Sequence, residues 1–277
     1  MGKYAVRPLQ LRLLRILDAF HEMCEVRGLR YYLVDGTLLG AVRHCGFIPW
    51  DDDLDVAMPR PDYELLIRNC REWLPEPLEF VSYEIDQSYP LHFGKVQDAS
   101  TTLIERPHLF YLGGIYIDVF PIDGAPGNRV LRKIHSVRYN FLRKSLYFAK
   151  RDPYRHGHGV SSWLPLLTRK LMSPDWLQCA IRREMTRYSF GKSELVGINL
   201  NDGIPAMLSR ENILGEPAPV EFEGKQFNGM RDNDAYLSSL FGNYMTPPPE
   251  GNRHVHDFYY LDLDSPYRSF DPSVLRK

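Results

Sequence analysis

Apolar positions along the first third of the chain follow the period of a helix, then that of a strand. The positions that recur at intervals of three and four are Leu13, Ile16, Leu17, Phe20 and Cys24. They predict an amphipathic helix over residues 9–27, and Gly28 predicts its end, because glycine readily adopts the conformation that closes helices. A strand over 29–34 and a short helical run over 38–43 are predicted to follow.

The same reading extends to the rest of the chain. A helix is predicted from Pro61 to about Leu74, since proline is favoured in a first helical turn. The predicted strands that follow it are 79–83, 91–97, 101–105 and 114–121. Residues 127 to about 192 are helical in pattern, and further strands over 194–200 and 220–227 precede a helix from about Asp234 to Phe241. The sequence predicts one domain over 1–277, of α+β or mixed α/β class, with a small mixed sheet, flanking helices and a helical insertion.

Four aspartates fall within five positions, at Asp51, Asp52, Asp53 and Asp55. In an extended segment successive side chains alternate faces, so Asp51, Asp53 and Asp55 are predicted to point one way and Asp52 the other. Two carboxylates about 5–6 Å apart repel by roughly 3 kcal/mol at an effective dielectric near 20. Such a group takes up protons or a cation, and oxygen ligands suit Mg²⁺ or Mn²⁺. The pattern predicts a metal site that holds phosphates.

The alternative interpretation of this run is an acidic surface turn, because most runs of like charge are solvated. The apolar segment 48–50 before it and the strand-like residues after it favour the site. A calcium EF-hand is excluded, because Val56 stands where that loop requires glycine. A phosphate-binding Walker loop is excluded as well, since no Gly-Lys-Ser/Thr sequence follows Gly36 and Gly40.

Composition and charge narrow the class of protein. The chain has 277 residues, of which 44% are hydrophobic and 25% charged, as in ordinary globular enzymes. A formal net charge of −1 disfavours nucleic acid as a partner. The four cysteines form no Cys-X-X-Cys pair, which argues against a disulfide framework and a cysteine zinc site. No apolar segment reaches the roughly 18 residues of a membrane span and no signal peptide is recognisable, so a cytoplasmic location is expected.

One motif links the chain to a known family. Gly36–Thr37 followed by Asp53-Leu54-Asp55-Val56 looks like the signature of the nucleotidyltransferase superfamily. The whole string over 36–60, GlyThrLeuLeuGlyAlaValArgHisCysGlyPheIleProTrpAspAspAspLeuAspValAlaMetProArg, more specifically resembles the LicD family of phosphorylcholine transferases and the fukutin-related ribitol-phosphate transferases. The resemblance covers about residues 15–260 and is weakest in the helical insertion.

This resemblance implies a nucleotidyltransferase-like fold and a reaction. A phospho-alcohol, phosphorylcholine foremost, would pass from a CDP-linked donor such as CDP-choline to a hydroxyl of a cell-surface glycan or its lipid-linked precursor, releasing CMP. Mg²⁺ or Mn²⁺ is the implied cofactor. Its implied ligands are Asp51, Asp53, Asp55 and Asp118, of which the last three would be the catalytic carboxylates. Asp118 lies in an otherwise apolar strand, where it would bind metal or accept the acceptor's proton; a buried structural aspartate is the alternative.

Further residues are expected to bind the substrate. Backbone N–H groups at Gly36 and Thr37 would contact a phosphate, since glycine permits close approach. Arg43 and Lys95 would neutralise phosphate charge, although surface salt bridges are an alternative for both. The remaining candidates are Trp50, Arg253 and His256. Trp50 would contact the donor or pack in the core, and the other two would shape the donor pocket.

The insertion at about 127–192 is unusually basic. Residues 129–170 contain eleven Lys/Arg and one acid, Asp152. A helix over 131–146, with its apolar side packed and its cations solvated, is one interpretation. The other is a surface that docks an anionic or lipid-linked acceptor, with peripheral contact at the inner face of a membrane.

Two other functions are compatible with the superfamily motif. The first is a true nucleotidyltransferase that attacks an NTP and releases pyrophosphate. The second is a degenerate, non-enzymatic module that binds a glycan or a membrane. The segments around the motif favour phospho-alcohol transfer over the first, and the intact Gly36, Thr37, Asp53, Asp55 and Asp118 argue against the second.

Overall fold

The computed structural model describes residues 4–109, 111–155, 157–198, 207–249, 251, 256 and 258–273. Within these ranges the main sheet has seven strands in the order β1-β2-β6-β4-β3, with β7 added beside β6 and β8 beside β7. The strands of this sheet are β1 (Tyr32–Leu33), β2 (Asp55–Pro59), β3 (Leu78–Val81), β4 (Gly94–Asp98), β6 (Tyr116–Ala125), β7 (Leu195–Ile198) and β8 (Met207–Ser209). Both parallel and antiparallel pairs occur, so the predicted α+β class with a mixed sheet is confirmed.

Strand β6 lies at the centre of the sheet, between β2 and β4, and carries Asp118 in its first half. It runs parallel to β2, with Asp118 opposite Asp55, and antiparallel to β4, with Asp118 opposite Lys95. Its residues Ile117, Val119 and Ile122 are fully buried. Three residues distant in the sequence are thereby held side by side on adjacent strands.

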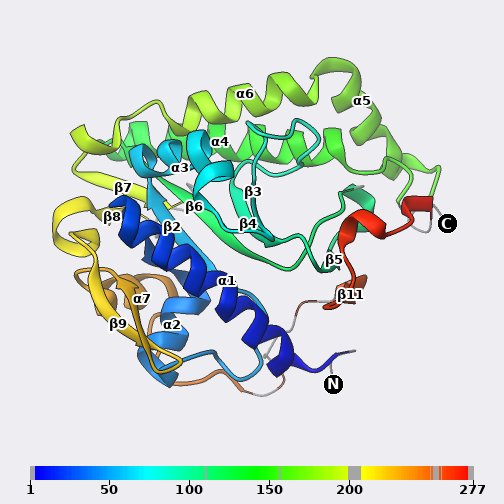
Figure 1. Cartoon of the computed structure of the whole chain (residues 1–277). Coiled ribbons are helices and arrows are strands. Elements are labelled where there is room, and N and C mark those ends of the chain that lie inside the picture. The colour runs from blue at the N-terminus through cyan, green and yellow to red at the C-terminus, as the bar shows by residue number, and fades with distance from the viewer. Residues whose placement is uncertain are drawn as a thin grey trace.

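Helices cover the sheet and extend beyond it (Figure 1). They are α1 (Val6–Arg27), α2 (Asp35–His44), α3 (Arg60–Trp73), α4 (Arg129–Lys150), α5 (Trp163–Leu171), α6 (Pro174–Met185) and α7 (Asn233–Phe241). Helix α1 packs on β4 and β6, and α3 packs on β2, β3 and β6. Helices α4 and α6 lie side by side at the top of the view, with α5 next to them. In the described residues no helix is long and apolar enough to cross a membrane.

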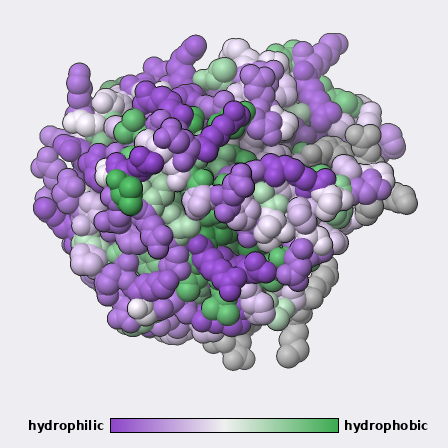
Figure 2. Space-filling view, in the orientation of Figure 1, coloured by the Kyte–Doolittle hydropathy of each residue, from purple (hydrophilic) through white to green (hydrophobic). Residues whose placement is uncertain are grey.

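The predicted helical insertion is present and has a small core of its own. Its buried cluster consists of Tyr139, Leu146, Ala149, Leu177, Ile181 and Met185. These side chains come from α4 and α6, which explains why the two helices stay paired along the rim of the sheet. The outer face of the molecule is mostly hydrophilic, with hydrophobic residues gathered in a hollow near the centre of the view (Figure 2).

Several predicted strands differ in the structure. The strand predicted over 220–227 is a hairpin of β9 (Ala218–Phe222) and β10 (Lys225–Gly229). Its turn residues Glu223 and Gly224 both have positive φ, 52° and 74°, as a two-residue hairpin turn requires. The strand predicted over 29–34 is confined to β1, and that over 91–97 begins only at Gly94. Two short strands were not predicted, β8 and β11 (Tyr260–Asp262), which pairs with β5 (Thr102–Ile104).

A buried ion pair ties α3 to the far half of β6. Arg60 Nε donates to Asp123 Oδ1 at 2.7 Å, and its terminal nitrogen lies 2.5 Å from Oδ2. The Asp123 side chain is 1% exposed and that of Arg60 is 12% exposed. Such two-point contacts are among the strongest polar interactions in proteins, so this pair fixes α3 against the strand that carries Asp118.

Candidate active site

The first turn of α2 is joined to the start of β2 by Thr37. Its buried Oγ1 accepts a hydrogen bond from the backbone N–H of Asp55 at 2.8 Å. The predicted turn at Gly36–Thr37 is therefore the beginning of a helix, Asp35–His44, and the first N–H groups of a helix have no acceptor within the helix. The threonine hydroxyl holds the position of Asp55, and the helix start remains able to face an anion.

Gly36 lies against Asp51. A Cβ atom at residue 36 would come within 2.8 Å of Asp51 Oδ2, closer than real Cβ contacts. Gly36 was predicted from the sequence to contact a phosphate. The structure adds a steric reason for a glycine here, because a side chain at residue 36 would displace the Asp51 carboxylate.

Substitution of Gly36 tests this contact. Gly36→Ala is expected to displace the Asp51 carboxylate and to lower the turnover rate about 10²-fold, the typical effect of a misplacement near 1 Å. Gly127→Ala is the matched control, because a Cβ there would meet nothing within 4 Å. Steady-state rates and melting temperatures of both variants decide the matter; equal rates for the two would contradict the positioning role.

Buried carboxylates gather where β2 and β6 begin. Burial, reinforced by the charge of Asp53, raises the pKa of Asp51 to about 8. Burial also raises the pKa of Asp53. It raises the pKa of Asp55 well above its ordinary value, and the charges of Asp53 and Asp118 raise it further. The carboxylates of Asp51, Asp53 and Asp55 therefore repel one another when charged, and burial leaves these charges poorly solvated.

Asp118 faces Lys95 across the β4–β6 pair. Lys95 Nζ lies 3.3 Å from Asp118 Oδ1 and 3.9 Å from Glu105 Oε2, and the lysine side chain is buried. The contact with Asp118 is an ion pair without hydrogen-bond geometry, since Oδ1 is buried with no hydrogen-bond partner among the described residues. Burial, opposed by Lys95, raises the pKa of Asp118 to about 6. The lysine is thus positioned to neutralise charge at the site.

Asp52 turns away from this group and holds His256. Its carboxylate accepts hydrogen bonds from His256 Nδ1 at 2.7 Å, from the backbone N–H of His256 at 3.0 Å and from the hydroxyl of Tyr4. The bond to Asp52 raises the pKa of His256 to about 9, so the imidazole is a cation at neutral pH. His256 Nε2 lies 3.8 Å from Asp53 Oδ2, which places a second positive charge beside the cluster.

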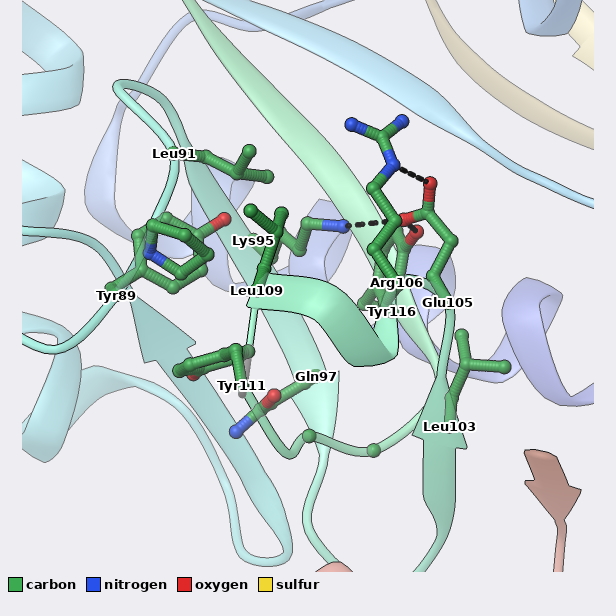
Figure 3. Close-up of a pocket in the computed structure, with 13 residues that line it drawn as sticks. Tyr89, Leu91, Lys95, Gln97, Leu103, Glu105, Arg106, Leu109, Tyr111 and Tyr116 are labelled. Atoms are coloured by element: carbon green, nitrogen blue, oxygen red, sulfur yellow. Dashed lines mark hydrogen bonds and ion pairs between the residues drawn. The ribbon is translucent and has the colours of Figure 1, made fainter. Parts of the chain in front are cut away.

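A cavity of about 750 Å³ opens beside these residues. Its walls include Asp53, Asp118, Lys95 and His256 on the side of the sheet and, opposite them, residues of α4 such as Lys144. A smaller cavity of about 50 Å³ adjoins it and shares several lining residues. Figure 3 shows Lys95 and Arg106 directed at Glu105 at one end of this smaller cavity and the rings of Tyr89 and Tyr111 at the other.

Of the predicted site residues, two do not line the cavity and a third lies outside the residues that the structure describes. Arg43 donates to the backbone carbonyl of Tyr244 at 2.6 Å, so it anchors the segment that precedes the proline loop. Trp50 is half-buried against the core and meets His44 edge-on, with ring centroids 6.5 Å apart. Arg253 lies outside the residues that the structure describes.

Two residues of the site were not predicted from the sequence. Asp35 is half-buried beside the cluster, has a positive φ of 48° and accepts a hydrogen bond from the hydroxyl of Tyr236 at 2.8 Å. A non-glycine residue in that conformation is strained, and such strain is often found at functional sites. Tyr116 was also missed, although its ring faces Lys95 Nζ at 3.0 Å from the centroid. The sequence contains no spacing signal for either residue.

The residues of the cluster fit a divalent cation in their chemistry. They offer carboxylate oxygens, their charged forms are disfavoured by burial and mutual repulsion, and Asp118 Oδ1 has no hydrogen-bond partner in the described part of the chain. Across the described residues no three acidic, histidine or cysteine side chains converge at metal-ligand spacing. A bound cation would offset the repulsion between the carboxylates of the cluster.

Comparison with known proteins agrees with this geometry. Residues 28–144 match the family model described as LicD/FKTN/FKRP, nucleotidyltransferase domain. The chain is 30% identical to the lipopolysaccharide cholinephosphotransferase LicD of Haemophilus influenzae, over 94% of this chain and 100% of that protein. It is also 44% identical to the human ribitol 5-phosphate transferase FKRP over 48 residues, 17% of this chain and 9% of that protein.

A cluster of carboxylates at the start of adjacent strands, faced by a buried lysine beside a large cavity, suits an enzyme that handles phosphates. The near full-length similarity makes the assignment specific: the chain belongs to the LicD family of phosphotransferases.

Proposed function

We propose that this protein transfers a phospho-alcohol, phosphorylcholine foremost, from a CDP-linked donor to a glycan hydroxyl and releases CMP. The observation that carries the proposal is the placement of Asp53 and Asp118 with Lys95 at the wall of one cavity, in a chain similar to LicD over nearly its full length. The glycan acceptor follows the printed name of that relative, which acts on lipopolysaccharide.

Asp51, Asp53, Asp55 and Asp118 are the residues that would hold Mg²⁺ or Mn²⁺. When bound, the cation supplies charge neutralisation for the donor diphosphate. Lys95 adds a fixed positive charge on the other side of Asp118. In this proposal the acids that now repel one another become ligands, and their high pKa values report the charge that the cation offsets.

Asp118 is proposed to take the proton of the acceptor hydroxyl. Its Oδ1 has no hydrogen-bond partner among the described residues, and the aspartate lines the cavity. A carboxylate that lines the cavity can serve as a general base once the acceptor hydroxyl lies within hydrogen-bond reach. Lys95 then holds the carboxylate in place.

The smaller cavity supports choline as the alcohol. Its walls include the rings of Tyr89 and Tyr111, away from the end where Lys95 and Arg106 pair with Glu105 (Figure 3). Aromatic faces suit a quaternary ammonium group, whereas a polyol such as ribitol needs many hydrogen-bonding partners.

Release of CMP tests the proposal. Purified protein is incubated in parallel with CDP-choline, CDP-ribitol and CDP-glycerol and Mg²⁺, with and without EDTA, in the presence of a lipopolysaccharide acceptor. The expected result is CMP from CDP-choline that disappears with EDTA and returns with excess Mg²⁺. Pyrophosphate release from CTP or ATP in the same assay, without CMP from any CDP-alcohol, would instead support the nucleotidyltransferase alternative.

A further inference from the structure

One side of α4 exposes a row of apolar residues to solvent. The row consists of Val130, Ile134, Val137 and Phe141, which follow one another at intervals of four, three and four. Val137 is 60% exposed and Phe141 is 57% exposed. On a helix this spacing places the four side chains on one face.

The opposite side of α4 is the one that packs. His135, Tyr139, Leu146 and Ala149 are buried against the rest of the molecule, and Tyr139, Leu146 and Ala149 belong to the core shared with α6. The exposed apolar row is therefore not the inner face of the helix. Its residues are the ones that a sequence pattern alone would assign to the core.

Helix α5, which packs against α4, repeats this feature. Its exposed apolar residues are Trp163, Leu164, Leu166, Leu167 and Leu171, and Trp163 is 68% exposed. Soluble proteins seldom expose so many large apolar side chains on adjoining helices unless the surface has a binding role. We name the apolar row of α4 and these α5 residues the insertion face.

Cations surround the insertion face. Helix α4 has seven Lys/Arg and no acidic residue among its 22 positions. Lys133 and Lys144 on α4 and Lys170 on α5 are exposed. Apolar residues mixed with lysine and arginine, together with an exposed tryptophan, are typical of helices that lie in the interface of a bilayer with anionic lipids.

The insertion face also leads to the candidate active site. Phe148 lies seven residues beyond Phe141 on the same side of α4, and both Phe148 and Lys144 line the cavity that contains Asp118. The helix thus connects an outward apolar surface with the cavity wall opposite the acids. An acceptor held in a membrane by a lipid tail would reach the cavity along this side of α4.

From these observations we infer that the insertion face docks the protein on the surface of an anionic lipid bilayer. The occupant is the bilayer itself: the apolar residues enter the acyl boundary and the lysines contact anionic headgroups. This inference gives the acceptor of the proposed reaction a location, but vesicle binding needs neither donor nor metal. Its failure is therefore distinguishable from failure of the proposed chemistry.

Vesicle flotation tests the inference. The full chain is mixed with vesicles of phosphatidylethanolamine and phosphatidylglycerol, or of phosphatidylcholine alone, at low and high salt. The expected result is binding to the anionic vesicles that weakens with salt and is at least about tenfold weaker on neutral ones, since each cation near an anionic surface contributes about fivefold. Absence of binding to anionic vesicles would overturn the inference.

Matched variants locate the surface. Phe141→Ser/Leu167→Ser removes two exposed apolar residues of the insertion face, and Leu11→Ser/Val26→Ser removes two exposed apolar residues of α1. The first variant is expected to bind anionic vesicles at least about tenfold more weakly, because two buried side chains are lost from the acyl boundary. The α1 variant is expected to bind as the parent does.

Two controls keep the result interpretable. Release of CMP from CDP-choline in the absence of membranes should be the same for parent and both variants, since the substituted residues lie outside the cavity lining. Light scattering measures the oligomeric state and so shows whether a second copy of the chain covers the insertion face. A parent that dimerises through the insertion face and does not bind vesicles, or an insertion-face variant that binds vesicles as tightly as the parent, would overturn the inference.

Discussion

Asp55→Asn is expected to abolish phospho-alcohol transfer while leaving the fold more stable. Asp55 begins β2 beside Asp118, and its charged form is disfavoured by burial and by neighbouring carboxylates. Removing one preorganised charged group from an active site typically lowers the rate about 10²–10³-fold. Removing the repulsion is expected to raise the free energy of unfolding of the metal-free protein by about 0.5–2 kcal/mol.

Initial rates of CMP release and urea denaturation in EDTA measure the two effects. Glu72→Gln, at an exposed position of α3, is the matched control for loss of a carboxylate and should change neither quantity. A gain in stability together with a loss of activity would show that Asp55 is needed for the reaction and not for the fold. Retained activity in Asp55→Asn would remove it from the proposed metal site.

Asp123→Leu is expected to destabilise the protein by about 3–5 kcal/mol, because it leaves the Arg60 guanidinium largely buried without its partner. The double variant Arg60→Met/Asp123→Leu should recover much of this loss, since no unpaired charge remains. Urea denaturation followed by circular dichroism gives all three free energies of unfolding. A loss below about 1 kcal/mol in the single variant would show that solvent or Glu64 compensates the arginine.

The helices and strands were easier to predict from the sequence than the contacts between them. Periodicity identified the helices, and the helix predicted over 9–27 ends at Gly28, which has the expected left-handed φ of 64°. Because side chains alternate faces in an extended segment, Asp52 was predicted to point away from the other three aspartates. In the structure Asp52 has a different contact, with His256. Pairing across 204 residues has no local signal, so the reason for that separation was not predictable.

The position of Asp118 and the packed face of α4 depend on tertiary contacts that the sequence does not reveal. Asp118 was a candidate because a charged residue in an apolar strand is unusual, but its position opposite both Asp55 and Lys95 depends on the strand order. In α4 the sequence offers two helical rows, and the more apolar one, which includes Val137, was expected to pack. The row with Tyr139 packs instead, because it meets α6. Composition alone does not tell which row faces the neighbour.

Transfer of phosphorylcholine with release of CMP requires that the acceptor hydroxyl attack the phosphorus of CDP-choline that carries the alcohol. Hydrolysis of CDP-choline in water enriched in oxygen-18 measures this without an identified acceptor, because water replaces the glycan hydroxyl. Mass spectrometry of the products should find the label in phosphocholine and unlabelled CMP, which corresponds to attack on the β-phosphorus. Label in CMP would mean attack on the α-phosphorus, as in a nucleotidyltransferase, and would contradict the proposed reaction.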